Sequence, residues 1–212
     1  MSAFLGPIHF WLFSKIQTME SRAFAIAAVL DKAGKGDIVK EMTDGYGEEL
    51  QGVSLEEIIG DNPIHQFLSG LIAKVQVFES QLVEASGDAF ETALAAVEEH
   101  GRQTATQALG GKPGPDNYED IYRYINDYQL EGMPCDPSAE VDLAPEGPMS
   151  YAHSACNHIQ NWRYTGVDIK KMCDITNTWL KGFVNGLNDK AQFSVDNTIA
   201  KGANSCGATV KM

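Results

Sequence analysis

The sequence predicts an α+β protein with a mainly helical N-terminal half and a small C-terminal module of one helix and antiparallel strands. Three observations predict this class. Before residue 131, apolar residues recur at spacings of three and four through several long segments, the period of helices with one buried face. A motif occurs twice in the same half. Near the C-terminus, apolar and polar residues alternate as they do in strands.

The repeated motif predicts duplicated helical hairpins. A Pro-Ile-His triplet stands at residues 7–9 and again at 63–65, and each is followed by a lysine-containing stretch that ends in Glu-Ser. We therefore expect helix pairs at residues 5–58 and 61–111, stacked in a helical domain of residues 1–137. The second copy carries three additional residues between its histidine and its lysine, which turns the helix face by about 60° short of a full turn.

The apolar stripes place the helices of this half. We expect them at residues 8–30, 64–82, 88–109 and 118–130. Asn62 precedes Pro63, so Asn62 is predicted to cap the second of these helices, with the proline in its first turn. Breaker runs of glycine and proline at 110–115 and 132–137 then mark loops.

The remaining residues, 138–212, form the predicted C-terminal module. A short strand is expected at residues 141–143, and a helix at 168–187 with Met172, Ile175, Trp179, Phe183 and Leu187 on one stripe. Two alternating strands follow, around Phe193 and between Cys206 and Val210, joined by a turn at residues 202–205. A helix packed on a hairpin is an α+β arrangement.

Composition limits the partners. The chain has 212 residues, and its 16 Lys+Arg against 29 Asp+Glu give a formal charge of −13. Such a charge repels phosphate backbones and anionic lipid surfaces, so no nucleic-acid or membrane partner is predicted. No stretch approaches the roughly 20 apolar residues of a membrane span. A small-molecule ligand is the expected partner, and the sequence leaves a homo-oligomer open.

The predicted compartment is the cytoplasm. The apolar N-terminal stretch has no preceding Lys or Arg and no clean small-residue cleavage site, so we interpret it as part of a helix rather than a signal peptide. The four cysteines, Cys135, Cys156, Cys173 and Cys206, are widely spaced in a chain long enough to build its own core. Free thiols are expected, and an exported protein with two disulfides is the alternative.

The C-terminal third carries the densest set of chemically reactive residues. The stretch 151–162 contains Cys156 between two histidines, Cys173-Asp174 lies in the next helix, and a Thr-Ile-Ala-Lys-Gly-x-x-x-Cys hairpin closes at Cys206. In these elements the chain resembles the L-2-amino-thiazoline-4-carboxylic acid hydrolase-like family. The resemblance implies a hydrolase acting on a C–N or C–S bond of a small heterocycle or amide.

The closing hairpin also resembles the vinyl-4-reductase-like domain, a small-molecule sensing module. Relatives of that domain hold zinc through the cysteine at position 206, a cysteine eight residues earlier and a glutamate three residues before that. Thr198 and Val195 occupy those two positions here. This departure argues against the relatives' zinc site.

Two hypotheses of function follow. In the first, Cys156 is the nucleophile, His153 or His158 is the base and Asp174 orients. On a regular helix only His153 would share a face with Cys156, and a buried, inert cysteine beside surface histidines is the alternative.

In the second hypothesis the protein binds or senses a small molecule without catalysis. Its apolar pocket is then lined by aromatic residues and one further cysteine, namely Trp11, Tyr151, Trp162, Trp179 and Cys173.

A metal site is a third hypothesis. His9 and His65 occupy equivalent positions in the two repeats, and a carboxylate or Cys156 would have to complete their ligand set. A polar histidine at a helix start is the simpler interpretation. The sequence requires no cofactor, and its cofactor content is unknown from sequence.

Overall fold

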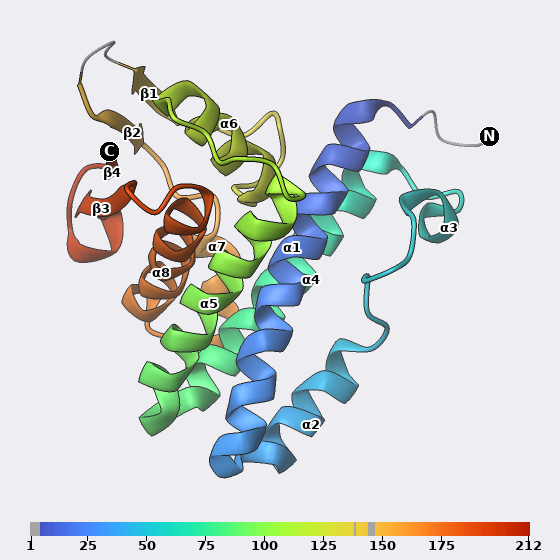
Figure 1. Cartoon of the computed structure of the whole chain (residues 1–212). Coiled ribbons are helices and arrows are strands. Elements are labelled where there is room, and N and C mark those ends of the chain that lie inside the picture. Colours follow the sequence, from blue (N-terminus) through green and yellow to red (C-terminus); the bar gives the residue numbers. More distant parts are fainter. Residues whose placement is uncertain (1–4, 138, 144–146) are drawn as a thin grey trace.

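The computed structural model describes residues 5–137, 139–143 and 147–212; the predicted domain boundary falls at residue 138, which lies outside this description. The helices, shown in Figure 1, are α1 (Pro7–Leu30), α2 (Gly36–Tyr46), α3 (Leu55–Ile59), α4 (Ile64–Ser86), α5 (Phe90–Leu109), α6 (Tyr118–Tyr128), α7 (Ile159–Trp162) and α8 (Ile169–Leu187). The strands are β1 (Glu140–Leu143), β2 (Met149–His153), β3 (Gln192–Asn197) and β4 (Cys206–Lys211). Short π and 3-10 turns occur at Asp31–Lys35, Gly87–Ala89, Arg163–Thr165 and Ile199–Lys201.

The two longest helices, α1 and α4, pack against each other and form the centre of the helical half (Figure 1). After α1 the chain reverses through a π-helical turn in which Gly34 has φ +84, a conformation that side chains with a Cβ rarely adopt. Helix α2 then returns to pack on α4, and α5 packs on α1. Each predicted hairpin therefore contacts the other.

Helices α5 and α8 pack closely against each other through glycines. A Cβ on Gly101 would lie 2.3 Å from the backbone oxygen of Trp179, and one on Gly182 would lie 2.0 Å from that of Glu98. Gly186 likewise faces Ala105. Small residues let the two backbones approach closely, and this contact joins the helical half to the C-terminal module.

The four strands form one antiparallel sheet in the order β1-β2-β4-β3. Tyr151 pairs with Ala208 and Met149 with Val210, and all four side chains are buried on the face toward the helices. One hydrophobic core runs from Ala23 in α1 to the sheet.

The predicted fold class is confirmed: the protein is α+β, with a helical N-terminal half. Asn62, however, does not cap α4. Its side-chain amide donates to the Ile59 carbonyl at the end of α3, and Pro63 stands at the N-cap of α4. The division into two domains, and the duplication of residues 5–58 in 61–111, stay predictions. None of the helices in the described ranges has both the length and the apolar character that crossing a membrane requires.

Candidate ligand-binding cavity

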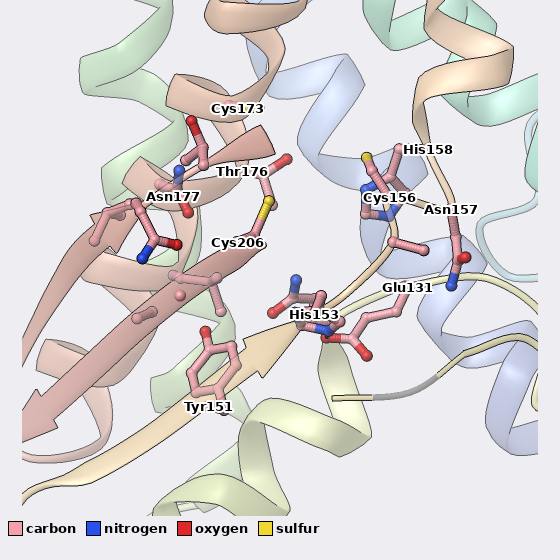
Figure 2. A pocket seen from close by; sticks show the side chains of 18 of the residues that line it. Glu131, Tyr151, His153, Cys156, Asn157, His158, Cys173, Thr176, Asn177 and Cys206 are labelled. Carbon is pink, nitrogen blue, oxygen red and sulfur yellow. The ribbon is translucent and has the colours of Figure 1, made fainter. Parts of the chain in front are cut away.

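A half-open cavity of about 90 Å³ lies between α8, the inner face of the sheet and the chain that joins α6 to α7. Figure 2 shows its side chains, with Cys206 on one side and Cys156 and His158 on the other. The lining residues are Gln129, Glu131, Tyr151, His153, Ala155, Cys156, Asn157, His158, Trp162, Cys173, Thr176, Asn177, Leu180, Val195, Asn197, Thr198, Cys206, Gly207 and Ala208.

Buried polar atoms without a hydrogen-bond partner are concentrated in residues that line this cavity. In the described chain, six buried side-chain nitrogen or oxygen atoms lack a partner, and five of them belong to cavity residues. These five are Gln129 Oε1, Tyr151 Oη, Trp162 Nε1, Thr176 Oγ1 and Thr198 Oγ1. Native proteins leave few such atoms unpaired, so their concentration in one place needs an explanation.

Glu131 and His153 form a hydrogen-bonded pair in the cavity wall. His153 Nε2, on β2, donates to Glu131 Oε1 at a distance of 2.9 Å. Burial alone would raise the pKa of the Glu131 carboxyl, but the hydrogen bond from His153 and the charge of Lys15 bring that pKa below its ordinary value. Lys15 is itself buried above the Trp11 ring, and burial lowers its pKa to about 8.

His158 is held as a neutral donor. Its Nε2 donates to the Leu130 carbonyl at 2.9 Å, and its ring stacks on Trp162 with centroids 4.9 Å apart. Burial lowers the pKa of this imidazole. The hydrogen bond also fixes the tautomer, because a nitrogen that donates to a carbonyl must carry the proton.

Three of the four cysteines line the cavity, and all four are free thiols. Cys156 lies in the loop before α7, where burial raises the pKa of its thiol despite hydrogen bonds from the His158 and Ile159 backbone amides. Burial raises the pKa of Cys173 to about 12. The Cys206 sulfur accepts the backbone N–H of Ile199 at 3.3 Å.

The aromatic residues predicted to line a pocket separate into two groups. Tyr151 and Trp162 line the cavity together with Cys173. Trp179 instead borders a smaller cavity beside it and donates to His100 Nδ1, and Trp11 donates to Asp127 Oδ1 at 2.9 Å. Asp174 does not line the cavity.

The histidines of the repeat are placed at two helix starts. His9 Nδ1 accepts the backbone N–H of Gly6 at 2.9 Å and so caps α1, whereas His65 is exposed in the first turn of α4. Across the described ranges, no group of three or more His, Cys, Asp or Glu side chains is arranged to hold a metal ion. The structure therefore does not join His9 and His65 with a third ligand.

Several cavity residues escaped the sequence analysis. Gln129 and Glu131 follow α6, Thr176 and Asn177 lie on α8, and Thr198 lies after β3. Each is an ordinary polar residue whose significance comes from burial. Of these five residues, only Thr198 was singled out by the sequence, because it stands where relatives of the vinyl-4-reductase-like domain have a zinc-binding cysteine.

Comparisons with known proteins give few similarities. No family model matches the chain, and no curated protein matches it. A solved structure of an H-NOX protein from S. oneidensis, in the Fe(II)NO ligation state, matches with a TM-score of 0.44 and 14% identity over 90% of this chain and 97% of that chain. The resemblance of the C-terminal third to thiazoline hydrolase-like proteins stays a prediction.

The prediction of a hydrolase is corrected. The site lacks the activated nucleophile that the prediction required. A thiolate is the attacking species, yet burial keeps the Cys156 thiol protonated. The proposed bases are engaged elsewhere, His153 with Glu131 and His158 with the Leu130 carbonyl.

Proposed function

We propose that this protein binds a small molecule in the cavity without transforming it, and that it acts as a sensing or accessory protein. The observation that carries the proposal is the half-open cavity, whose lining combines apolar side chains such as Leu180 with polar ones such as Asn177 and Glu131. Small-molecule sites typically combine an apolar lining with a few such placed polar groups.

A reducing compartment fits this function. Cys156, Cys173 and Cys206 face the same cavity as free thiols, and an oxidising environment would expose them to disulfide formation. We therefore propose a cytoplasmic location. The charge of −13 argues against nucleic acid as its partner.

A cavity-filling variant tests the proposal. Val195 lines the cavity from β3 and is 39% exposed, so Val195→Trp fills the space with little effect on folding. Ser194 is exposed and neighbours Val195 on the same strand, where successive side chains point to opposite faces, so Ser194→Trp is the matched control.

Both variants and the unchanged protein are screened by thermal shift against a fragment library that spans neutral, anionic and cationic compounds. Stabilising fragments are expected for the unchanged protein and for Ser194→Trp, and none for Val195→Trp. Equal responses from all three proteins, or no response from any, would overturn the proposed function.

A further inference from the structure

We propose that a groove between α2 and α4 binds an amphipathic helix of a partner protein, whose apolar face enters the groove and whose flanks carry lysine or arginine. The groove has a volume of about 630 Å³. None of the described residues lines both this groove and the ligand cavity, so the proposal stands independently of the small-molecule function. It follows from the apolar side chains and glycines that line the groove and from the charge of its rim.

Two helix faces form the walls of the groove. Helix α2 contributes Ile38, Met42 and Gly45, and α4 contributes residues that include Gly70 and Val77. Residues spaced by three, four or seven positions lie on one face of a helix. The two helices contact each other, and α2 lies at the outer edge of the helical half (Figure 1). An open channel between two adjacent helices is the kind of surface on which a third helix packs.

Large apolar side chains are exposed along this groove. Tyr164, in the 3-10 turn after α7, is 83% exposed, and Ile38 on α2 is 41% exposed. A single exposed apolar residue is ordinary, but these two line one groove together with Met42 and Val77. A contiguous apolar patch is typical of a protein interaction site, and tyrosine is a frequent anchor in such interfaces.

Two glycines line the groove inside helices, where glycine is destabilising relative to alanine. They are Gly45 on α2 and Gly70 on α4, and neither has a positive φ. A Cβ at either position would meet no atom within 4 Å, so packing within the described chain does not require glycine there. Between α5 and α8, by contrast, Gly101 and Gly182 let two helix backbones approach closely. Gly45 and Gly70 leave the same room for the backbone of an incoming helix.

The charge of the rim favours a basic partner. Residues 36–49, which contain α2, carry five exposed carboxylates and one lysine, and that lysine pairs with Asp44. Two further cations lie near the groove: Lys74, which lines it and donates to the Glu48 carbonyl, and Arg163, which is exposed in the turn after α7. Five carboxylates against three cations leave the rim negative, in a chain whose formal charge is −13. Lysine or arginine on the flanks of a docked helix complements this charge.

A second copy of the chain fits the groove less well than a basic helix does. Two copies each carry a charge of −13 and therefore repel each other. A symmetric dimer through this face would also bring the same carboxylates together across the contact. Self-association is the alternative that the test must detect.

A designed peptide probes the groove. The probe is a fluorescein-labelled peptide of about 14 residues, roughly four helical turns, with leucine on one face and lysine on the opposite face. One control peptide has the same composition in an order that gives no apolar face, and a second has glutamate in place of lysine. Fluorescence anisotropy is expected to show saturable binding of the lysine peptide, and binding at least about tenfold weaker for both controls.

Variants of the protein test where the peptide binds. Gly70→Leu fills the space kept for the incoming backbone, so it should weaken binding at least about tenfold while the protein stays folded. Ser69→Leu, exposed on the same helix and outside the groove lining, is the matched control and should leave binding unchanged. Glu41→Lys should weaken binding several-fold, whereas Glu119→Lys, exposed on α6, should not. Val195→Trp, in the ligand cavity, should also leave the peptide bound.

Several results would overturn the inference. Absence of saturable binding, or equal binding of the lysine peptide and its reordered control, would show that the groove recognises no helical face. Equal binding of the glutamate peptide would show that the partner is not basic, and binding that Gly70→Leu leaves unchanged would show that the peptide binds elsewhere. Analytical ultracentrifugation of the protein alone detects the other occupant: a dimer that Gly70→Leu abolishes would make the groove a self-association surface.

Discussion

Arg22 and Glu79 form a bidentate ion pair inside the helical half, with Arg22 Nε 2.6 Å from Glu79 Oε1 and Nη2 2.8 Å from Oε2. The two side chains are 7% and 0% exposed. The pair links α1 to α4 at the level where the Arg22 guanidinium also approaches the Trp179 ring of α8. Water is excluded, so each charge depends on the other.

Removing one partner is expected to be far more damaging than removing both. Glu79→Ala should lower the free energy of unfolding by about 3–5 kcal/mol, because it leaves a buried guanidinium without its carboxylate. The double variant Arg22→Met with Glu79→Leu should recover part of that loss. Urea unfolding measures both. Asp44→Ala, in the exposed Lys40–Asp44 pair, is the control and should change stability by less than about 1 kcal/mol. A loss no larger for Glu79→Ala than for this control would contradict the prediction.

The close contact between α5 and α8 predicts that a side chain larger than glycine at this interface destabilises the protein. Gly182→Ala should destabilise the protein by about 1–3 kcal/mol, because its Cβ would collide with the Glu98 backbone. Gly70→Ala is the matched control: Gly70 is in α4, and a Cβ there meets nothing within 4 Å. It should stabilise by roughly 0.5–1 kcal/mol through helix propensity. Thermal unfolding of the two variants checks the opposite signs.

Helix boundaries were largely predictable because local signals decide them. The apolar stripe predicted a helix at residues 168–187, and the structure begins α8 at Ile169 with Asp168 as the N-cap that accepts from the Lys170 amide. The strand order β1-β2-β4-β3 was not predicted, because pairing depends on contacts between distant residues. The Asn62 prediction was wrong for a similar reason: a carbonyl at the end of α3 competes for the same side chain.

The chemistry of the site was less predictable than its location. Cys156 and His153 were found because reactive residue types stand out in a sequence. Activation, however, depends on burial, and burial of the Cys156 thiol shifts its pKa upward, opposite to what a nucleophile needs. Gln129 and Thr176 gave no signal in the sequence, because only the fold brings them to the cavity wall.

His100 predicts an acid-sensitive stability. Its Nδ1 accepts from Trp179 Nε1 at 3.0 Å and its Nε2 lies 3.0 Å from Ser21 Oγ, so the ring is neutral with the proton on Nε2. Burial, and then the charge of Arg22, lower its pKa from 6.5 to about 4. The unfolded chain protonates this imidazole more readily than the folded chain does. The contribution of His100 to the free energy of unfolding is therefore complete above pH 6.5 and is lost as pH falls toward 4.

A variant without the titrating ring isolates this effect. Glutamine can still accept from Trp179 and donate to Ser21, so His100→Gln should retain the fold. Between pH 7 and pH 4.5 the unchanged protein should lose roughly 2 kcal/mol more stability than His100→Gln. Urea midpoints at several pH values measure the difference. Parallel pH profiles for the two proteins would rule out His100 as the source.

Tyr151 and Tyr46 predict different costs for losing a buried hydroxyl. The Tyr151 hydroxyl has no hydrogen-bond partner among the described residues, so Tyr151→Phe should leave stability unchanged or raise it by about 1 kcal/mol. The Tyr46 hydroxyl donates to buried Glu20 at 2.6 Å, so Tyr46→Phe should cost about 1–3 kcal/mol. Urea unfolding of the two variants measures the difference. Equal destabilisation by the two substitutions would show that the Tyr151 hydroxyl is paired.

The cavity thiols should react slowly despite lining an open space. Alkylation requires the thiolate, and burial raises the pKa of Cys156 and brings that of Cys173 to about 12. Cys135 is exposed. With iodoacetamide at pH 8, mass spectrometry should find Cys135 modified first, with Cys156 and Cys173 at least about tenfold slower until the protein is unfolded in urea. Cys135→Ser should remove the fast phase and leave the slow phase unchanged. Fast modification of Cys156 in the folded protein would instead indicate an activated thiol and reopen the question of catalysis.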